Sequence, residues 1–271
     1  MSRVWLSGVL LSAAMVANLF GEAATAAEVD AAPSLLPAVS GVNGKVEASA
    51  GWADLDSLGN DAVLRGGASL SLPVGDMFGL QADAAVVDVF DNAMAGGAAH
   101  LFTRDPSSYL LGVVVGAGTS DDADVFFVGP EAELYLDSIS VEGWGGFMSS
   151  DVDGVGSRDD AFGQVDLGFY ASDNLRFTLG GSSYAGFEAG RVGMEWQIGE
   201  VGVPVSLTAD ARFGENDFTS VSAGLKIYFG GEDKSLIQRH REDDPPNRSV
   251  DAFTGAAAAG QNRPELPPPP P

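Results

Sequence analysis

Two histidines, His100 and His240, are the natural candidates for a general base near neutral pH in this sequence. Hydrolases that act on lipid or peptide activate a serine or a water through such a base. His240 falls in the C-terminal tail, and His100 falls close to the turn that Arg104, Asp105 and Pro106 predict. We therefore expect a structural role for His100 and no catalytic residue in the chain.

Clustered aspartates are the second feature that could do chemistry. The stretch Asp151–Asp160 begins like a calcium-binding loop, but Phe162 occupies the position of the closing bidentate glutamate. Asp121, Asp122 and Asp124 form another cluster. The sequence has no cysteine, which excludes disulfides and thiolate zinc sites. We expect no committed metal or cofactor site, with solvated loops or weak divalent cation binding as the remaining alternatives.

The charge of the chain limits its partners. The formal net charge is −24, and no stripe of lysine and arginine interrupts it. A polyanion would be repelled, so nucleic acid is excluded as a partner. The acidic residues concentrate between segments of alternating polarity, which indicates charged loops.

That alternation extends from Asn43 to Phe229. In about a dozen short segments, one residue is apolar and the next is small or polar, which is typical of β-strands with one apolar face. Each segment has about 8–12 residues, close to the length of a tilted strand that crosses a bilayer. Tight turns alternate with longer, mostly acidic loops. The pattern predicts an all-β fold over residues 43–229, a 12-stranded antiparallel up-and-down transmembrane β-barrel.

Closure is expected because an open sheet edge in hydrocarbon leaves backbone groups without partners. The apolar face would then point to lipid and the charged face to the lumen, where opposite charges can pair across strands. The charged side chains expected in the lumen are Lys45, Arg65, Asp83, Glu131, Glu133, Glu142, Asp166, Arg176, Arg191, Glu195, Asp210, Arg212 and Lys226.

The two ends of the chain differ from this core. Residues 1–26 read as a secretory signal peptide, and residues 27–42 as an N-terminal periplasmic segment. Residues 230–271 are expected to be a periplasmic tail, first basic and then Pro-rich and disordered. In this tail Lys234, Arg239 and Arg241 are expected to contact head groups of the periplasmic leaflet.

Three stretches carry a resemblance to known proteins. They are Gly97–Pro106, Glu131–Leu136 and Lys234–Arg241. They resemble a family of porin-like outer-membrane β-barrel proteins of proteobacteria. The resemblance implies a barrel in the Gram-negative outer membrane with periplasmic termini, and it implies no activity. The expected partners are outer-membrane lipid, lipopolysaccharide and the barrel-assembly machinery.

We therefore expect a structural envelope component or a narrow porin-like channel for small solutes, because twelve strands enclose less space than the 16–18 of open porins. One alternative is an outer-membrane barrel enzyme that hydrolyses lipid or peptide. The other is a soluble periplasmic, lipocalin-like binding barrel, whose apolar side chains would point inward. The direction of the apolar face distinguishes this last alternative from the others.

Overall fold

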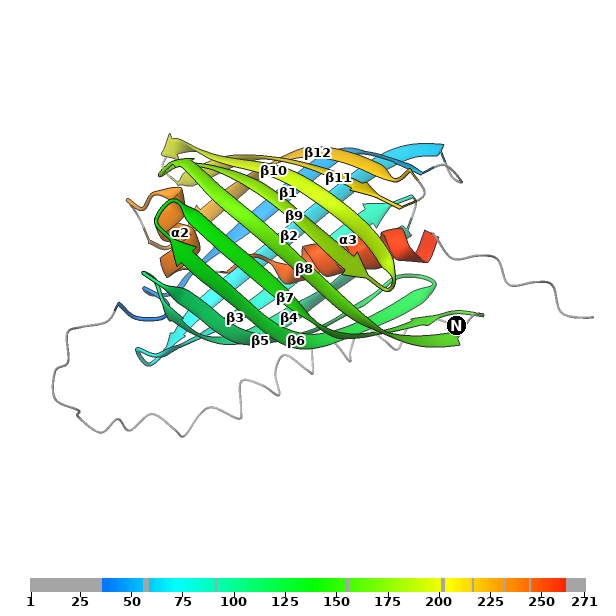
Figure 1. Ribbon diagram of the computed structural model, residues 1–271, viewed down its shortest axis with the longest axis horizontal. Coiled ribbons are helices and arrows are strands. Elements are labelled where there is room, and N and C mark those ends of the chain that lie inside the picture. The colour runs from blue at the N-terminus through cyan, green and yellow to red at the C-terminus, as the bar shows by residue number, and fades with distance from the viewer. Residues whose placement is uncertain are drawn as a thin grey trace, which may run out of the picture. The chain divides into compact units, whose positions relative to one another are not determined.

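The computed structural model describes residues 36–55, 59–90, 92–154, 156–200, 203–215, 217–231, 233–243 and 245–261. Within these residues twelve antiparallel strands form one closed barrel, in which each strand pairs with its sequence neighbours and β1 pairs with β12 (Figure 1). The strands are β1 (Asn43–Leu55), β2 (Gly59–Val74), β3 (Phe78–Val89), β4 (Asn92–Asp105), β5 (Tyr109–Thr119), β6 (Ala123–Leu136), β7 (Ile139–Val152), β8 (Gly156–Ser172), β9 (Leu175–Tyr184), β10 (Phe187–Glu200), β11 (Pro204–Gly214) and β12 (Thr219–Phe229). The predicted fold class is confirmed.

The outer surface of the barrel is apolar. Large side chains such as Leu64, Val113 and Leu179 are more than half exposed there, while the charged residues between them are buried inside. Aromatic residues at strand ends, including Trp52 and Trp196, also point outward. An apolar exterior around a closed sheet is the arrangement of a transmembrane barrel. The soluble, lipocalin-like alternative is therefore wrong, since it requires the opposite orientation.

The hairpins define two ends. We call the end with the β2–β3, β4–β5, β6–β7, β8–β9 and β10–β11 connections the turn end, and the opposite end the loop end. The strands extend farther into the loop end than the sequence indicated. Asp151 pairs with Ser157, and Val152 with Gly156, so most of the stretch from Asp151 to Asp160 is a β-hairpin. This corrects the loop expected there, and no group of three or more potential metal-ligating side chains was found among the described residues.

The C-terminal region contains two helices, α2 (Leu236–Glu242) and α3 (Arg248–Gln261). α3 runs inside the barrel, while α2 lies at one end of it (Figure 1). The expectation that residues 243–261 are disordered is therefore wrong. An isolated Ala-rich helix of this length is marginal in water, so its order depends on the surrounding barrel. No helix in the described part of the chain is long and apolar enough to cross a membrane. Residues 1–26 and the Pro-rich stretch after Gln261 lie outside the described residues.

Candidate functional site: the occupied lumen

The chain turns into the barrel immediately after β12. Gly230 and Gly231 both have positive φ, and a Cβ on Gly230 would lie 2.5 Å from the carbonyl oxygen of Val42. Two glycines are thus suited to this reversal. Ser235 and Gln238 then form a capping box at the start of α2.

α2 covers the mouth at the turn end. The amide of Leu236 donates to the side chain of Asn174 at 3.1 Å, and that of Ile237 to the carbonyl of Asp173 at 3.0 Å, both in the β8–β9 turn. On the other side, Arg241 donates to the carbonyl oxygens of Asp137 and Ile139 in the β6–β7 hairpin. The helix is therefore attached to several turns at once.

These contacts bear on the role expected for the basic residues of the tail. Arg239 is 1% exposed and donates to Gln197 and to the carbonyl of Gly230. Lys234 donates to Ser40 and Asp243. Arg239 is therefore buried within the protein and not available to lipid head groups. The expected contact of Lys234 and Arg241 with the periplasmic leaflet stays a prediction.

A short extended stretch, residues 245–247, leads from α2 to α3 through the charged part of the lumen. Lys45 and Gln81 donate to the carbonyl oxygen of Pro245 at 2.7 and 3.2 Å. The side chain of Asn247 donates to the carbonyl oxygens of Ala68 and Ala84 on adjacent strands. The barrel wall thus provides partners for both backbone and side-chain groups of this stretch.

Arg248 begins α3 and faces an acidic wall. Its backbone amide donates to Asp83 at 3.2 Å. Its guanidinium group lies 3.7 Å from a carboxylate oxygen of Glu131 and 3.8 Å from one of Glu133 on β6. The same group lies over the ring of Trp144 at 5.7 Å. A buried cation is thus placed against buried carboxylates, as its desolvation requires.

One turn later, Asp251 faces a basic wall. Arg212 donates to it at 2.8 Å and Arg191 at 3.3 Å, and Gln164 donates to its other oxygen at 3.2 Å. Thr254 continues this face and accepts a hydrogen bond from Arg65 at 3.2 Å. The helix therefore presents a positive and a negative side chain to parts of the wall that carry the complementary charge.

The loop-end part of α3 is apolar, and so is the lumen around it. Phe253 and the alanines that follow belong to a buried cluster with strand-end residues such as Leu55, Val89 and Phe187. Glycines make room for the helix, because a Cβ on Gly118 would lie 2.5 Å from the Phe253 ring. The Gly- and Ala-rich strands β4 and β5 thus leave space for α3 on their inner face.

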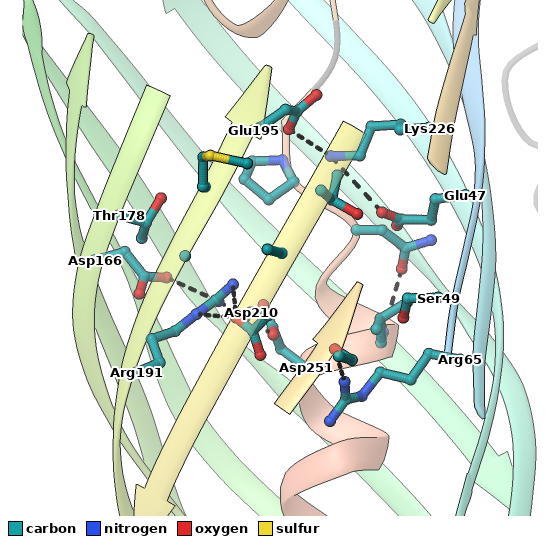
Figure 2. Close-up of a pocket in the computed structure, with 18 of the residues that line it drawn as sticks. Glu47, Ser49, Arg65, Asp166, Thr178, Arg191, Glu195, Asp210, Lys226 and Asp251 are labelled. Atoms are coloured by element: carbon teal, nitrogen blue, oxygen red, sulfur yellow. Dashed lines mark hydrogen bonds and ion pairs between the residues drawn. The ribbon is translucent and has the colours of Figure 1, made fainter. Parts of the chain in front are cut away.

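A polar cavity of about 170 Å³ remains beside the helix. The charges expected in the lumen lie on the inner wall (Figure 2), where most are buried and Arg191, Asp210 and Lys226 line the cavity. Lys226 pairs with Glu195 at 2.9 Å and Arg191 with Asp210 at 3.1 Å. Cross-strand pairs and the C-terminal segment together narrow the lumen, and the cavity beside α3 has room for several water molecules.

Both histidines lie within this charged interior. His100 is fully buried, with one ring nitrogen 2.9 Å from Glu131 and the other 3.0 Å from Asp83. In the described part of the chain, we find no serine or threonine hydroxyl bonded to either histidine.

His240 does not lie beyond the barrel as expected. It is inside the turn-end mouth, with its ring nitrogens 2.8 Å from the Tyr170 hydroxyl and 3.2 Å from the Tyr228 hydroxyl. Burial lowers the pKa of His240 below 6.5, and the attraction of the nearby Glu195 carboxylate offsets this only in part.

Comparisons with known proteins agree with this architecture. A KdgM porin in complex with disordered oligogalacturonate has 8% sequence identity and a TM-score of 0.52, and the match covers 69% of this chain and 99% of that one. A second KdgM porin structure gives 8% identity, a TM-score of 0.50 and the same coverage. The barrel fold is similar to that of these porins. The outer membrane protein Omp33 of Acinetobacter baumannii matches at 9% identity and a TM-score of 0.45 over 69% of this chain and 98% of its own. No protein-family model and no curated protein matches the chain.

Sequence reasoning missed the helix that fills this porin-like barrel. Arg248, Asp251 and Thr254 are spaced three residues apart, and Phe253 and Ala257 are spaced four apart, as on two faces of one helix. That spacing was a usable signal. The polar and Ala/Gly-rich composition of the tail concealed it, because such a composition usually indicates disorder.

Proposed function

We propose that this protein is an outer-membrane channel for small solutes whose lumen is closed by its own C-terminal segment. The observation that carries the proposal is the charge complementarity of α3, with Arg248 against the Glu131–Glu133 wall and Asp251 against Arg191 and Arg212. A C-terminal segment that only extended from the barrel would not need charges complementary to those of the inner wall.

The attachment of this segment is non-covalent apart from its connection to β12. The chain has no cysteine, so no disulfide fixes α3 in the lumen. Its hydrogen bonds come from side chains on several strands, and each can be exchanged for water once the helix leaves. The closed form is therefore suited to opening by displacement of α3, which would expose a lumen lined with both signs of charge.

Truncation tests the proposal. A chain that ends after Gly231 retains all twelve strands of the described barrel and lacks α2 and α3. We expect planar-bilayer recordings to show a larger and more frequent conductance for this variant than for the full chain. A chain that ends after Glu242 retains α2 and separates the contribution of the covered mouth from that of the filled lumen.

Heat-modifiable migration on gels in mild detergent is the control that each truncated barrel has folded. If a folded variant without α2 and α3 conducts no more than the full chain, the channel proposal is wrong. The remaining role would then be that of a structural envelope component, in which α3 braces the barrel from inside.

A further inference from the structure

The C-terminal segment connects the two mouths of the barrel, because α2 lies at the turn end and the C-terminal part of α3 lies at the loop end (Figure 1). We propose that the chain passes completely through its own barrel, so that it leaves the lumen at Gln261 on the loop side of the membrane. This goes beyond closure of a channel, since a helix that enters and returns would close the lumen equally well.

The entry point is fixed at the turn end. Besides its hydrogen bonds to the β6–β7 and β8–β9 connections, α2 is tied to the segment before β1, where Ser40 donates its amide to the carbonyl of Glu242 at 3.0 Å. Ser40 also donates its hydroxyl to Asp243. The chain is therefore still at the turn end at Asp243.

The direction in which the chain runs through the lumen follows from the order in which its residues contact the barrel wall. Pro245 and Asn247 meet residues in the middle of β2 and β3, and Asp251 meets the arginines of β10 and β11. Farther along, a Cβ on Gly255 would lie 2.3 Å from the ring of Tyr184, the last residue of β9 at the loop end. From Pro245 to Gly255 these contacts thus move from the turn-end half of the wall to the loop end.

Ala257, Ala258 and Ala259 complete the crossing. They are buried in one cluster with Leu55, Val89, Met94, Phe187 and Phe218. Those partners are the last residues of β1 and β3, residues at the starts of β4 and β10, and the residue before β12, all at the loop end. A helix of fourteen residues spans about 21 Å, which is sufficient to carry the chain from the charged middle of the lumen to this rim.

The route between the two ends of the barrel is the lumen itself. α3 and the side chains packed around it occupy the lumen from its charged middle to this rim, with the polar cavity of about 170 Å³ beside the helix. A path outside the barrel would place unpaired backbone groups in hydrocarbon. In the proposed orientation the turn end faces the periplasm, so the chain leaves the lumen at the cell surface.

Unique thiols can test this path, because the natural chain has no cysteine. We would compare three full-length variants in intact cells with a membrane-impermeant maleimide. One carries Cys appended after Pro271, one carries Asp153→Cys in the β7–β8 hairpin at the loop end, and one carries Asp76→Cys in the β2–β3 turn. Both substituted positions are exposed, and heat-modifiable migration confirms that each barrel is folded.

We expect the appended thiol and the Asp153→Cys thiol to be labelled in intact cells, and the Asp76→Cys thiol only after the outer membrane is permeabilised. If the appended thiol is protected together with the Asp76→Cys thiol, the passage through the barrel is wrong although the orientation stands. If the Asp76→Cys thiol alone is labelled in intact cells, the orientation is wrong, while shared protection of the other two still supports the passage.

Discussion

Single side chains hold the C-terminal segment in the lumen, and Asp251 makes the most direct contacts. Its carboxylate accepts hydrogen bonds from Arg191, Arg212 and Gln164. Hydrogen bonds to charged groups contribute about 1.5–3 kcal/mol each. Arg191 and Arg212 also pair with Asp210, so they keep a carboxylate partner when Asp251 is replaced. The wall arginines were foreseeable from strand periodicity. Asp251 was not, because its partners lie far away in sequence and the residues around it look like a solvated tail.

Asp251→Asn should loosen α3. The substitution keeps the size of the side chain and removes the negative charge that Arg191 and Arg212 face. We expect the open fraction to increase roughly 10- to 100-fold, which corresponds to about 1.4–2.8 kcal/mol. The measurement is the labelling rate of Ser249→Cys by a small thiol reagent. Ser249 is fully buried, and its hydroxyl has no hydrogen-bond partner among the described residues, so the substitution is a mild one.

Asp122→Asn is the matched control, because it removes the same charge from an exposed position at the loop end. Its labelling rate should stay at that of the Ser249→Cys parent. Equal rates for the Asp251 and Asp122 variants would show that the carboxylate does not hold the helix.

At the scale of elements, the strands and α3 differ in what determines them. Each strand can be recognised from its own residues, because alternating polarity over about ten residues already shows which side chains share one face of the sheet. α3 cannot be recognised from its own residues in the same way. A short helix is unstable alone, and its polar and apolar faces are matched only by the lumen that the strands create. Sequence periodicity therefore predicted the strands of the barrel wall. It did not predict the helix inside the barrel, because that helix is stabilised by contacts between residues up to about two hundred positions apart in the sequence.

The packing of α3 against the barrel wall depends on glycines, and Gly118→Ala should weaken this packing. The added methyl would lie 2.5 Å from the ring of Phe253. Overpacking of this kind typically costs about 1–3 kcal/mol. We expect faster labelling of Ser249→Cys, and a much smaller effect of the same substitution in a Phe253→Ala background, where the ring is gone.

Gly193→Ala provides the comparison on another inward-facing part of the wall. There the added methyl would meet its nearest neighbour, Thr178, at 3.5 Å, an ordinary contact distance. Its labelling rate should match that of the parent. If Gly118→Ala behaves in the same way as Gly193→Ala, α3 does not rest on β5.

At the scale of the whole molecule, the side chains of the barrel have one orientation, with apolar side chains on the outer surface and charged side chains in the lumen. That arrangement requires a low-dielectric exterior, because the barrel would otherwise expose a continuous apolar surface to water. It also explains why the lumen could be foreseen as charged but not as occupied. Periodicity tells which side chains face inward, and it contains no information about what fills the space between them.

Leu179→Lys tests this orientation directly. Leu179 is 60% exposed in the middle of β9, where a lysine would lie in hydrocarbon. A lysine near the bilayer midplane destabilises a barrel by roughly 2–4 kcal/mol. Met77→Lys places the same charge in the β2–β3 turn, where the side chain is 68% exposed, and should change stability by less than about 0.5 kcal/mol. Denaturant titration in phospholipid vesicles measures both. Equal stabilities would mean that the outer face of β9 does not contact lipid, and the membrane position of the barrel would have to be abandoned.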